Sequence, residues 1–161
     1  MKIRDLMTKQ VASVRAADST AVAARLMWDC DCGAVPVVDD ESRVIAMITD
    51  RDICMASLMR DRAPSAIPVS EVMSRDLQCC QPDDNVSAAE QMMRSHQVRR
   101  VPIVDRERRL LGMLSLADIA RATDRQKGRG ARQVGADEVA GTLAEICATP
   151  REANPTTVAA F

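Results

Sequence analysis

The chain has 161 residues, a formal net charge of -1 and 47% apolar residues, with Trp28 and Phe161 as its only aromatic side chains. This length allows one domain, or two small repeats that share a core. The charge gives no overall attraction to nucleic acid, and two aromatic rings offer little surface for stacking bases. Because no apolar stretch reaches the roughly 20 residues of a membrane span and the first residues lack a signal-peptide core, we expect a cytoplasmic protein that binds neither membrane nor nucleic acid.

Six cysteines occur in the sequence, and we expect them to be reduced thiols rather than disulfides. Two pairs are close in sequence, Cys30 with Cys32 and Cys79 with Cys80, but neither has the two-residue gap typical of zinc knuckles. His96 is the only histidine. The sequence therefore predicts no metal site.

An internal repeat organises the first three quarters of the chain. Shifting the sequence by 66 residues aligns "AVPVVDDESRVIAMITDRDI" at 34–53 with "RVPIVDRERRLLGMLSLADI" at 100–119, without a gap. A register of this length indicates duplication. Both copies must then adopt the same local structure.

Each copy predicts the order β-α-β-β-α, an α/β (α+β) fold. A short extended piece precedes a polar turn that starts a helix, two apolar runs separated by five polar residues form a hairpin, and a second helix begins near Asp50 or Leu116. The predicted strands are 11–14, 35–38 and 44–48 in the first copy, and 77–80, 101–104 and 110–114 in the second.

The chain divides into four parts on this interpretation. The first repeat covers 1–60, a linker with two prolines covers 61–68, and the second repeat covers 69–123. A unit of about 55 residues buries too little apolar surface to be stable alone, so we expect the two to pack face to face with pseudo-twofold symmetry and two clefts between them. Residues 124–161 read as a basic linker, a short amphipathic helix at about 137–147 and a disordered end.

The C-terminal helix carries one apolar stripe. Val139, Leu143, Ile146 and Cys147 fall on one helical face. Because a helix of this length is marginal alone, we expect it to dock on its own body, on a dimer mate or on an effector protein.

Two related motifs, "MITDRDI" at 47–53 and "MLSLADI" at 113–119, end a predicted strand and begin a predicted helix. A hydroxyl residue followed at the third position by Asp can cap the helix. The same geometry can hold a nucleotide, because helix N-terminal N–H groups attract phosphate and a carboxylate can accept ribose hydroxyls. Both interpretations remain open at this point.

The repeat, the strand prolines Pro36 and Pro102, and the Thr/Ser-x-x-Asp motifs together resemble cystathionine-β-synthase (CBS) domains, paired as a Bateman module over about residues 1–123. The resemblance implies adenosine-containing ligands in the inter-repeat clefts, flat homodimers, and a regulatory rather than catalytic role. It assigns ribose contacts to Asp52 and Asp118, and phosphate-side hydroxyls to Thr49 and Ser115.

Basic residues distinguish the two predicted sites. Arg51 lies in the first helical turn, where the second repeat has Ala117, so the sites should differ in phosphate binding. Arg99 and Arg100 precede the second strand proline, and family members often contact phosphates from there. A pair of solvated surface arginines is the alternative, and adjacent strand residues should point in opposite directions.

The resemblance also implies where the base would lie. Small or aliphatic side chains and backbone would contact it, from Ser13, Val14, Ala34 and Val35 in one cleft and from Cys79, Cys80 and Val101 in the other. Cys79 stands where the family often has a hydroxyl residue, so a redox-sensitive pocket is a further hypothesis.

We therefore predict a stand-alone sensor that binds an adenosine nucleotide, forms a homodimer and regulates an unknown effector protein in trans, with no obligatory cofactor. The sequence shows no pair of a nucleophile and a base that would indicate an enzyme. A ligand-free dimerisation adaptor is the main alternative, ahead of a nucleotide-processing enzyme or a thiol-based redox sensor. The sequence leaves open AMP, ADP, ATP, NAD, S-adenosylmethionine and a cyclic dinucleotide.

Overall fold

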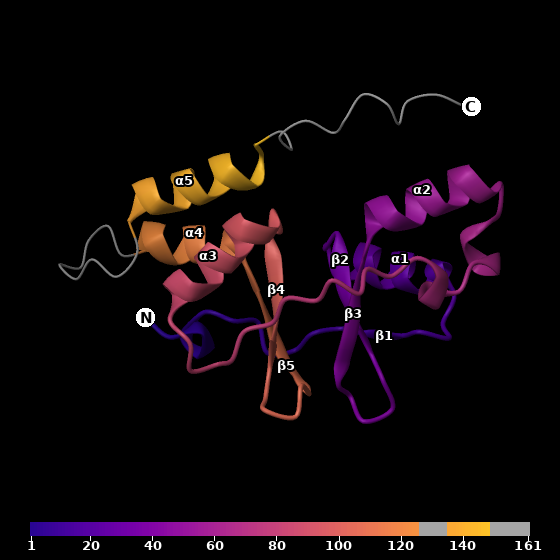
Figure 1. Ribbon diagram of the computed structural model, residues 1–161, viewed down its shortest axis with the longest axis horizontal. Coiled ribbons are helices and arrows are strands. Elements are labelled where there is room, and N and C mark those ends of the chain that lie inside the picture. The colour runs from indigo at the N-terminus through magenta and orange to yellow at the C-terminus, as the bar shows by residue number, and fades with distance from the viewer. Residues whose placement is uncertain (126–134, 149–161) are drawn as a thin grey trace.

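The computed structural model describes residues 1–125 and 135–148, and has two hairpins side by side with helices along one side of them (Figure 1). The first repeat contains β1 (Val14–Arg15), α1 (Thr20–Asp29), β2 (Ala34–Val38), β3 (Val44–Thr49) and α2 (Asp50–Arg60). The second contains α3 (Val86–His96), β4 (Arg100–Val104), β5 (Leu110–Ser115) and α4 (Leu116–Arg125), and α5 (Ala136–Ile146) follows. The predicted α+β architecture is confirmed.

The first repeat forms a three-stranded sheet. β1 pairs in parallel with β2, and β2 pairs antiparallel with β3. Val35 and Val37 on β2 and Ile48 on β3 are buried beside Ala23 and Met27 of α1. The sheet and helix thus share one apolar core.

The second repeat has the same antiparallel hairpin but only two strands in its sheet. The predicted strand at 77–80 is wrong in extent, because only Cys80 pairs there, through a parallel bridge to Ile103. The predicted strand at 11–14 is also wrong in extent: β1 is Val14–Arg15, so only Val14 belongs to both. Both segments are short because each pairs with a single neighbour for one or two residues before the helix-starting turn begins.

The two hairpins meet at equivalent residues. Arg43 bridges Arg109, which lies 66 positions later. Around this bridge, Val44 N donates to Arg108 O at 2.9 Å and Leu110 N donates to Ser42 O at 3.0 Å. These reciprocal bonds are what a pseudo-twofold axis between the repeats requires, since each maps onto the other.

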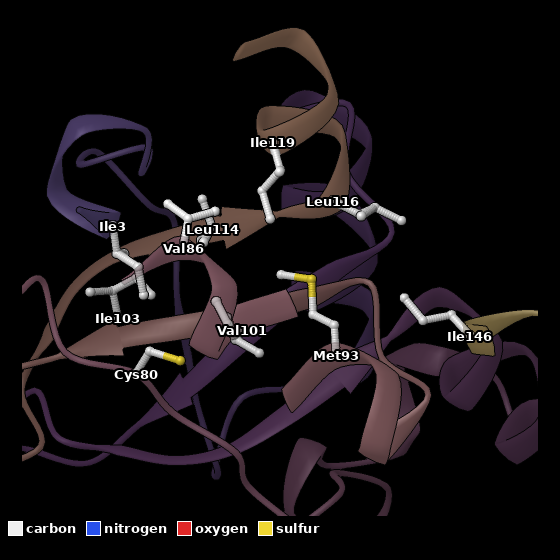
Figure 2. Packing of buried hydrophobic residues seen from close by; sticks show 11 residues of the cluster. Ile3, Cys80, Val86, Met93, Val101, Ile103, Leu114, Leu116, Ile119 and Ile146 are labelled. Carbon is white, nitrogen blue, oxygen red and sulfur yellow. The ribbon is translucent and has the colours of Figure 1, made fainter. Parts of the chain in front are cut away.

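The opening segment of each repeat packs into the other repeat. Ile3 is buried with Ile103 and Leu114 of the second repeat, as Figure 2 shows, while Val69 is buried in the core of the first. Backbone bonds fix both exchanges: Thr8 N donates to Met113 O at 2.9 Å, and Ser74 N donates to Met47 O at 2.8 Å. Neither repeat therefore has a complete core without the other.

The segment 61–68, predicted as a linker, packs closely on α1. Ile67 is fully buried, Ile67 O accepts from Thr20 N at 2.8 Å, and the Thr20 hydroxyl donates to Pro64 O at 2.8 Å. The helix α2 ends at Arg60, where Asp61 takes the left-handed conformation, and the segment with the two prolines then stays packed on the body.

The C-terminal helix α5 docks on its own chain, against α3 and α4 (Figure 1). Thr142 and Ile146 are buried in this contact, and Val139 is partly buried against the same core, whereas Leu143 and Cys147 are exposed. Of the three docking partners that the sequence left open, the structure thus shows the chain's own body.

The predicted basic linker and disordered end lie mostly outside the described residues. No helix within the described ranges is long and apolar enough to cross a membrane.

Candidate functional site

A cleft of about 840 Å³ lies where the two repeats and α5 meet. The ends of β3 and β5 and the first turns of α2 and α4 border it from opposite repeats. Six of the predicted site residues line it: Ala34, Thr49, Arg51, Arg99, Arg100 and Ser115. The pseudo-twofold packing therefore brings both motifs to one continuous cleft.

The first motif forms a complete helix cap. Asp52 Oδ2 accepts from Thr49 N at 2.9 Å and from the Thr49 hydroxyl at 2.7 Å, while Asp52 N donates to Thr49 Oγ1 at 3.2 Å. These bonds satisfy N–H groups that the first turn of α2 leaves without helical partners. Asp52 is half-buried in this cap and is not among the residues that line the cleft.

The second motif repeats the cap. Asp118 Oδ2 accepts from Ser115 N at 2.9 Å and from the Ser115 hydroxyl at 2.6 Å. Arg121, one turn further along α4, forms an ion pair with Asp118 Oδ1. Among the described residues, both Asp118 oxygens thus have protein partners, whereas only Oδ2 of Asp52 has one, so the two motifs differ in how many carboxylate oxygens the protein itself binds.

Basic side chains lie on opposite walls of the cleft. Arg51 borders it from the first repeat, and Ala117, its equivalent 66 positions later, borders it from the second. Arg99 and Arg100 border it from the second repeat, and Arg99 Nη2 also lies 3.7 Å from Cys147 Sγ of α5. Arg99 precedes β4, so the alternation expected of adjacent strand residues does not apply to this pair, and both line the cleft.

Most residues predicted to contact a base lie in the two cores instead. Val14 and Val35 are buried in the first repeat, and Cys80 and Val101 in the second. Ser13 and Cys79 are half-buried and do not line this cleft. Of this group only Ala34 borders it, because inward-facing strand positions are used for the core.

Burial raises the pKa of both adjacent thiols of the second repeat, Cys79 and Cys80. It raises the pKa of Cys80 to about 11, with smaller contributions from Asp84 and Cys79. It also raises the pKa of Cys79, against the opposing positive charge of Arg108. Since the thiolate is the reactive form, both groups are poor nucleophiles near neutral pH, which disfavours the redox hypothesis at these positions.

Further residues line the cleft that were not predicted as site residues, among them Asp50, Gln97, Val139 and Leu143. Asp50 is the first residue of α2, and its Oδ1 accepts from Arg51 N at 2.7 Å. Val139 and Leu143 belong to α5, whose periodicity predicted an apolar face but not what it would cover. Among residues 1–125 and 135–148, no group of three or more His, Cys, Asp or Glu side chains is placed to hold a metal ion.

The comparisons with known proteins agree on one family. The CBS domain model matches residues 3–59 and again 69–125. The CBS domain-containing protein YhcV of Bacillus subtilis is 41% identical over 118 residues, which cover 73% of this chain and 82% of that protein. Hypoxic response protein 1 of Mycobacterium tuberculosis is 34% identical over 118 residues, with the same coverage of both chains.

Solved structures share the fold. The structure of Hypoxic Response Protein I with two coordinated zinc ions superposes with a TM-score of 0.68 at 32% identity, covering 75% of this chain and 98% of that one. The CBS domain pair of protein MJ0100, in complex with 5′-methylthioadenosine and S-adenosyl-L-methionine, gives a TM-score of 0.71 at 24% identity and covers 79% and 98% of the two chains. With its two matched halves packed around a shared cleft, the chain belongs to the CBS-domain family and is a tandem pair of these domains.

Proposed function

We propose that this chain is a regulatory module that binds an adenosine nucleotide of the AMP, ADP or ATP class in the cleft between its repeats. The observation that carries the proposal is the convergence of two helix N-termini and three arginines on one cleft. Helix N-termini and guanidinium groups both stabilise phosphate, and here they border one cleft from opposite repeats.

A ligand bound in this position would contact both repeats at once. The repeats are joined by the reciprocal backbone bonds at Arg43 and Arg109 and by the exchanged opening segments. A ligand that binds one inter-repeat arrangement more tightly than another shifts the population toward it. We propose that this shift is the signal, read by an effector protein in trans and transmitted through a homodimer, and that the chain itself catalyses no reaction.

The family comparison supports this proposal at a coarse level. The MJ0100 domain pair holds 5′-methylthioadenosine and S-adenosyl-L-methionine, so the fold accommodates adenosine compounds in that protein. At 24% identity that structure establishes the fold alone for this chain. Three cleft arginines favour a phosphorylated ligand over a sulfonium compound here, because phosphate is the anion that guanidinium groups bind bidentately.

Calorimetric titration of the full chain with AMP, ADP and ATP tests the proposal. We expect saturable binding of at least one of them, and Arg51→Ala should weaken it about tenfold, which is about 1.4 kcal/mol. Arg106→Ala removes an exposed charge from the β4–β5 turn and serves as the control, with unchanged affinity. Absence of binding by all three compounds would contradict the proposal.

A ligand-free adaptor is the second candidate, and one observation favours it. Both capping boxes are complete within the protein, so neither motif needs a nucleotide to satisfy its helix. An adaptor predicts that the protein forms a dimer, measurable by sedimentation, and that no adenosine compound changes either its assembly or its stability.

A further inference from the structure

The helix α5 forms part of the cleft wall, although it lies outside both matched repeats, the second of which ends at residue 125. Val139 and Leu143 are four residues apart, so they share a helical face, and both line the cleft. Leu143 is 46% exposed, whereas Thr142 and Ile146 are buried against the second repeat. One face of α5 therefore holds the helix on the body, and the adjoining face presents apolar side chains to the cleft.

Two cleft residues contact the C-terminal end of α5. Gln97 donates to Ala148 O at 3.0 Å, and Arg99 Nη2 lies 3.7 Å from Cys147 Sγ. Cys147 follows Val139 by eight residues, about 12 Å along the helix. The guanidinium group therefore lies near one end of the apolar face of α5, and Val139 lies toward the other end.

The acidic side chains of α5 lie on a different face of the helix. Glu138 and Glu145 line a separate pocket, together with Glu90 and Arg94 of α3. Neither of these two glutamates is among the described residues that line the cleft. An anionic ligand in the cleft would therefore meet the apolar face of α5 rather than its carboxylates.

The apolar lining continues from α5 onto the second repeat. Val98, Leu116 and Ala120 line the cleft as well, and Leu143 is the most exposed large apolar side chain among the described cleft residues. Most of the strand residues predicted to contact a base are instead buried in the two cores. A base needs apolar contact on its ring faces, and none of the described cleft residues is aromatic, so aliphatic side chains have to supply that contact.

We propose that α5 is the base-binding wall of the cleft, with the adenine ring packed on Val139 and Leu143 and the phosphates turned toward the arginines. This inference rests on the proposed function and deepens it, because it identifies the element that distinguishes a nucleotide from other phosphate compounds. A nucleotide held in this way connects α5 with Arg51 of the first repeat, so α5 takes part in the ligand-dependent change between the repeats.

Calorimetric titration of the full chain and of Leu143→Ala with AMP, ADP and ATP, at low and at high salt, tests the inference. We expect Leu143→Ala to bind the tightest of the three about fivefold more weakly at both salt concentrations, because salt does not screen an apolar contact. The loss caused by Arg51→Ala should instead shrink at high salt, because this variant removes a charge.

Two further variants separate contact with the base from a general disturbance of the protein. Leu143→Met keeps a large apolar side chain and should bind within about twofold of the wild type. Leu111→Ala is the matched control, because Leu111 is 38% exposed on β5 and is not among the described cleft residues. Its affinity should equal that of the wild type.

The outcomes distinguish this inference from the proposed function. Equal affinity of the wild type and Leu143→Ala would overturn the inference and leave the proposed function in place. A loss in Leu143→Ala that disappears at high salt, or an equal loss in Leu111→Ala, would also overturn it. Failure of all three nucleotides to bind the wild type would contradict the proposed function itself, and this inference with it.

Discussion

The Thr49 hydroxyl donates to Asp52 Oδ2 at 2.7 Å and accepts from Asp52 N at 3.2 Å, so each residue of the pair caps the helix with the help of the other. Ser115 and Asp118 make the same pair of bonds in the second repeat. A role in ligand binding therefore has to be separated from a role in stability.

Loss of either aspartate should destabilise the protein even without ligand. Asp52→Ala and Asp118→Ala each remove the carboxylate half of a capping box and leave the backbone N–H of Thr49 or Ser115 without its acceptor, which costs about 1 kcal/mol. Asp52→Asn keeps an acceptor oxygen, so we expect a smaller loss. Urea unfolding measures all three changes. Wild-type stability in Asp52→Ala would show that the capping bonds contribute nothing.

Glu90 should make the protein less stable as the pH rises. This side chain is 1% exposed, and within the described residues neither carboxylate oxygen has a partner. Burial raises its pKa, and the negative charge of Glu138 on α5 raises it further, against the opposing effect of Arg94 on its own helix. The protonated form therefore stabilises the fold below the ordinary glutamate pKa, and this stability is lost as the pH rises through the higher pKa of the folded state.

The variant Glu90→Gln removes that titration. We expect it to be more stable than the wild type near neutral pH, on the order of 1 kcal/mol, with the difference shrinking toward pH 4. Urea unfolding at several pH values measures the difference, and Glu107→Gln, at an exposed position in the β4–β5 turn, is the matched control. A difference between Glu90→Gln and wild type that does not vary with pH would contradict this account.

Docking of α5 should contribute measurably to stability. Ile146→Ala removes a buried side chain from the core that α5 shares with α3 and α4, and we expect a loss of about 2 kcal/mol or more. Leu143→Ala, on the same helix but 46% exposed, is the control and should cost much less. If chemical denaturation gives equal losses for the two variants, α5 does not dock through Ile146.

The six thiols should react at very different rates with a thiol reagent. Cys30, Cys54 and Cys147 are exposed, whereas Cys80 is buried and its pKa is raised to about 11. Mass spectrometry after brief alkylation should find the three exposed residues modified and Cys80 unmodified. Early modification of Cys80, or loss of nucleotide binding when Cys79 is alkylated, would restore the redox hypothesis.

Much of the fold could be predicted because the repeat provides two independent observations of each element. The starts of α2 at Asp50 and α4 at Leu116 follow directly from the motifs, since a capping residue fixes where a helix begins. The exchange of the opening segments could not be predicted, because Ile3 and Val69 are equivalent in sequence and would fit either core.

The cleft was predicted in outline but not in its details. Thr49, Arg51 and Ser115 could be placed there because strand ends and helix starts meet at one edge. Leu143 could not be placed there, because the position of α5 depends on contacts with residues such as Arg94, which are distant in sequence. The residues predicted to contact the base came from family resemblance alone. The resemblance does not show which strand side chains are buried in the core.

The most direct test of the central claim is thermal unfolding of the full chain with AMP, ADP, ATP, NAD, S-adenosylmethionine and a cyclic dinucleotide, alongside Arg51→Ala and, as the control, Arg106→Ala. A compound at about a hundred times its dissociation constant adds about 2.7 kcal/mol to the stability, which raises the midpoint by several degrees. We predict that a phosphorylated adenosine compound raises the wild-type midpoint and that Arg51→Ala, which removes a guanidinium from the cleft wall and weakens binding about tenfold, shows only about half of this increase, whereas Arg106→Ala keeps it in full. An unchanged midpoint with every compound would contradict the nucleotide-sensor account and favour the ligand-free adaptor.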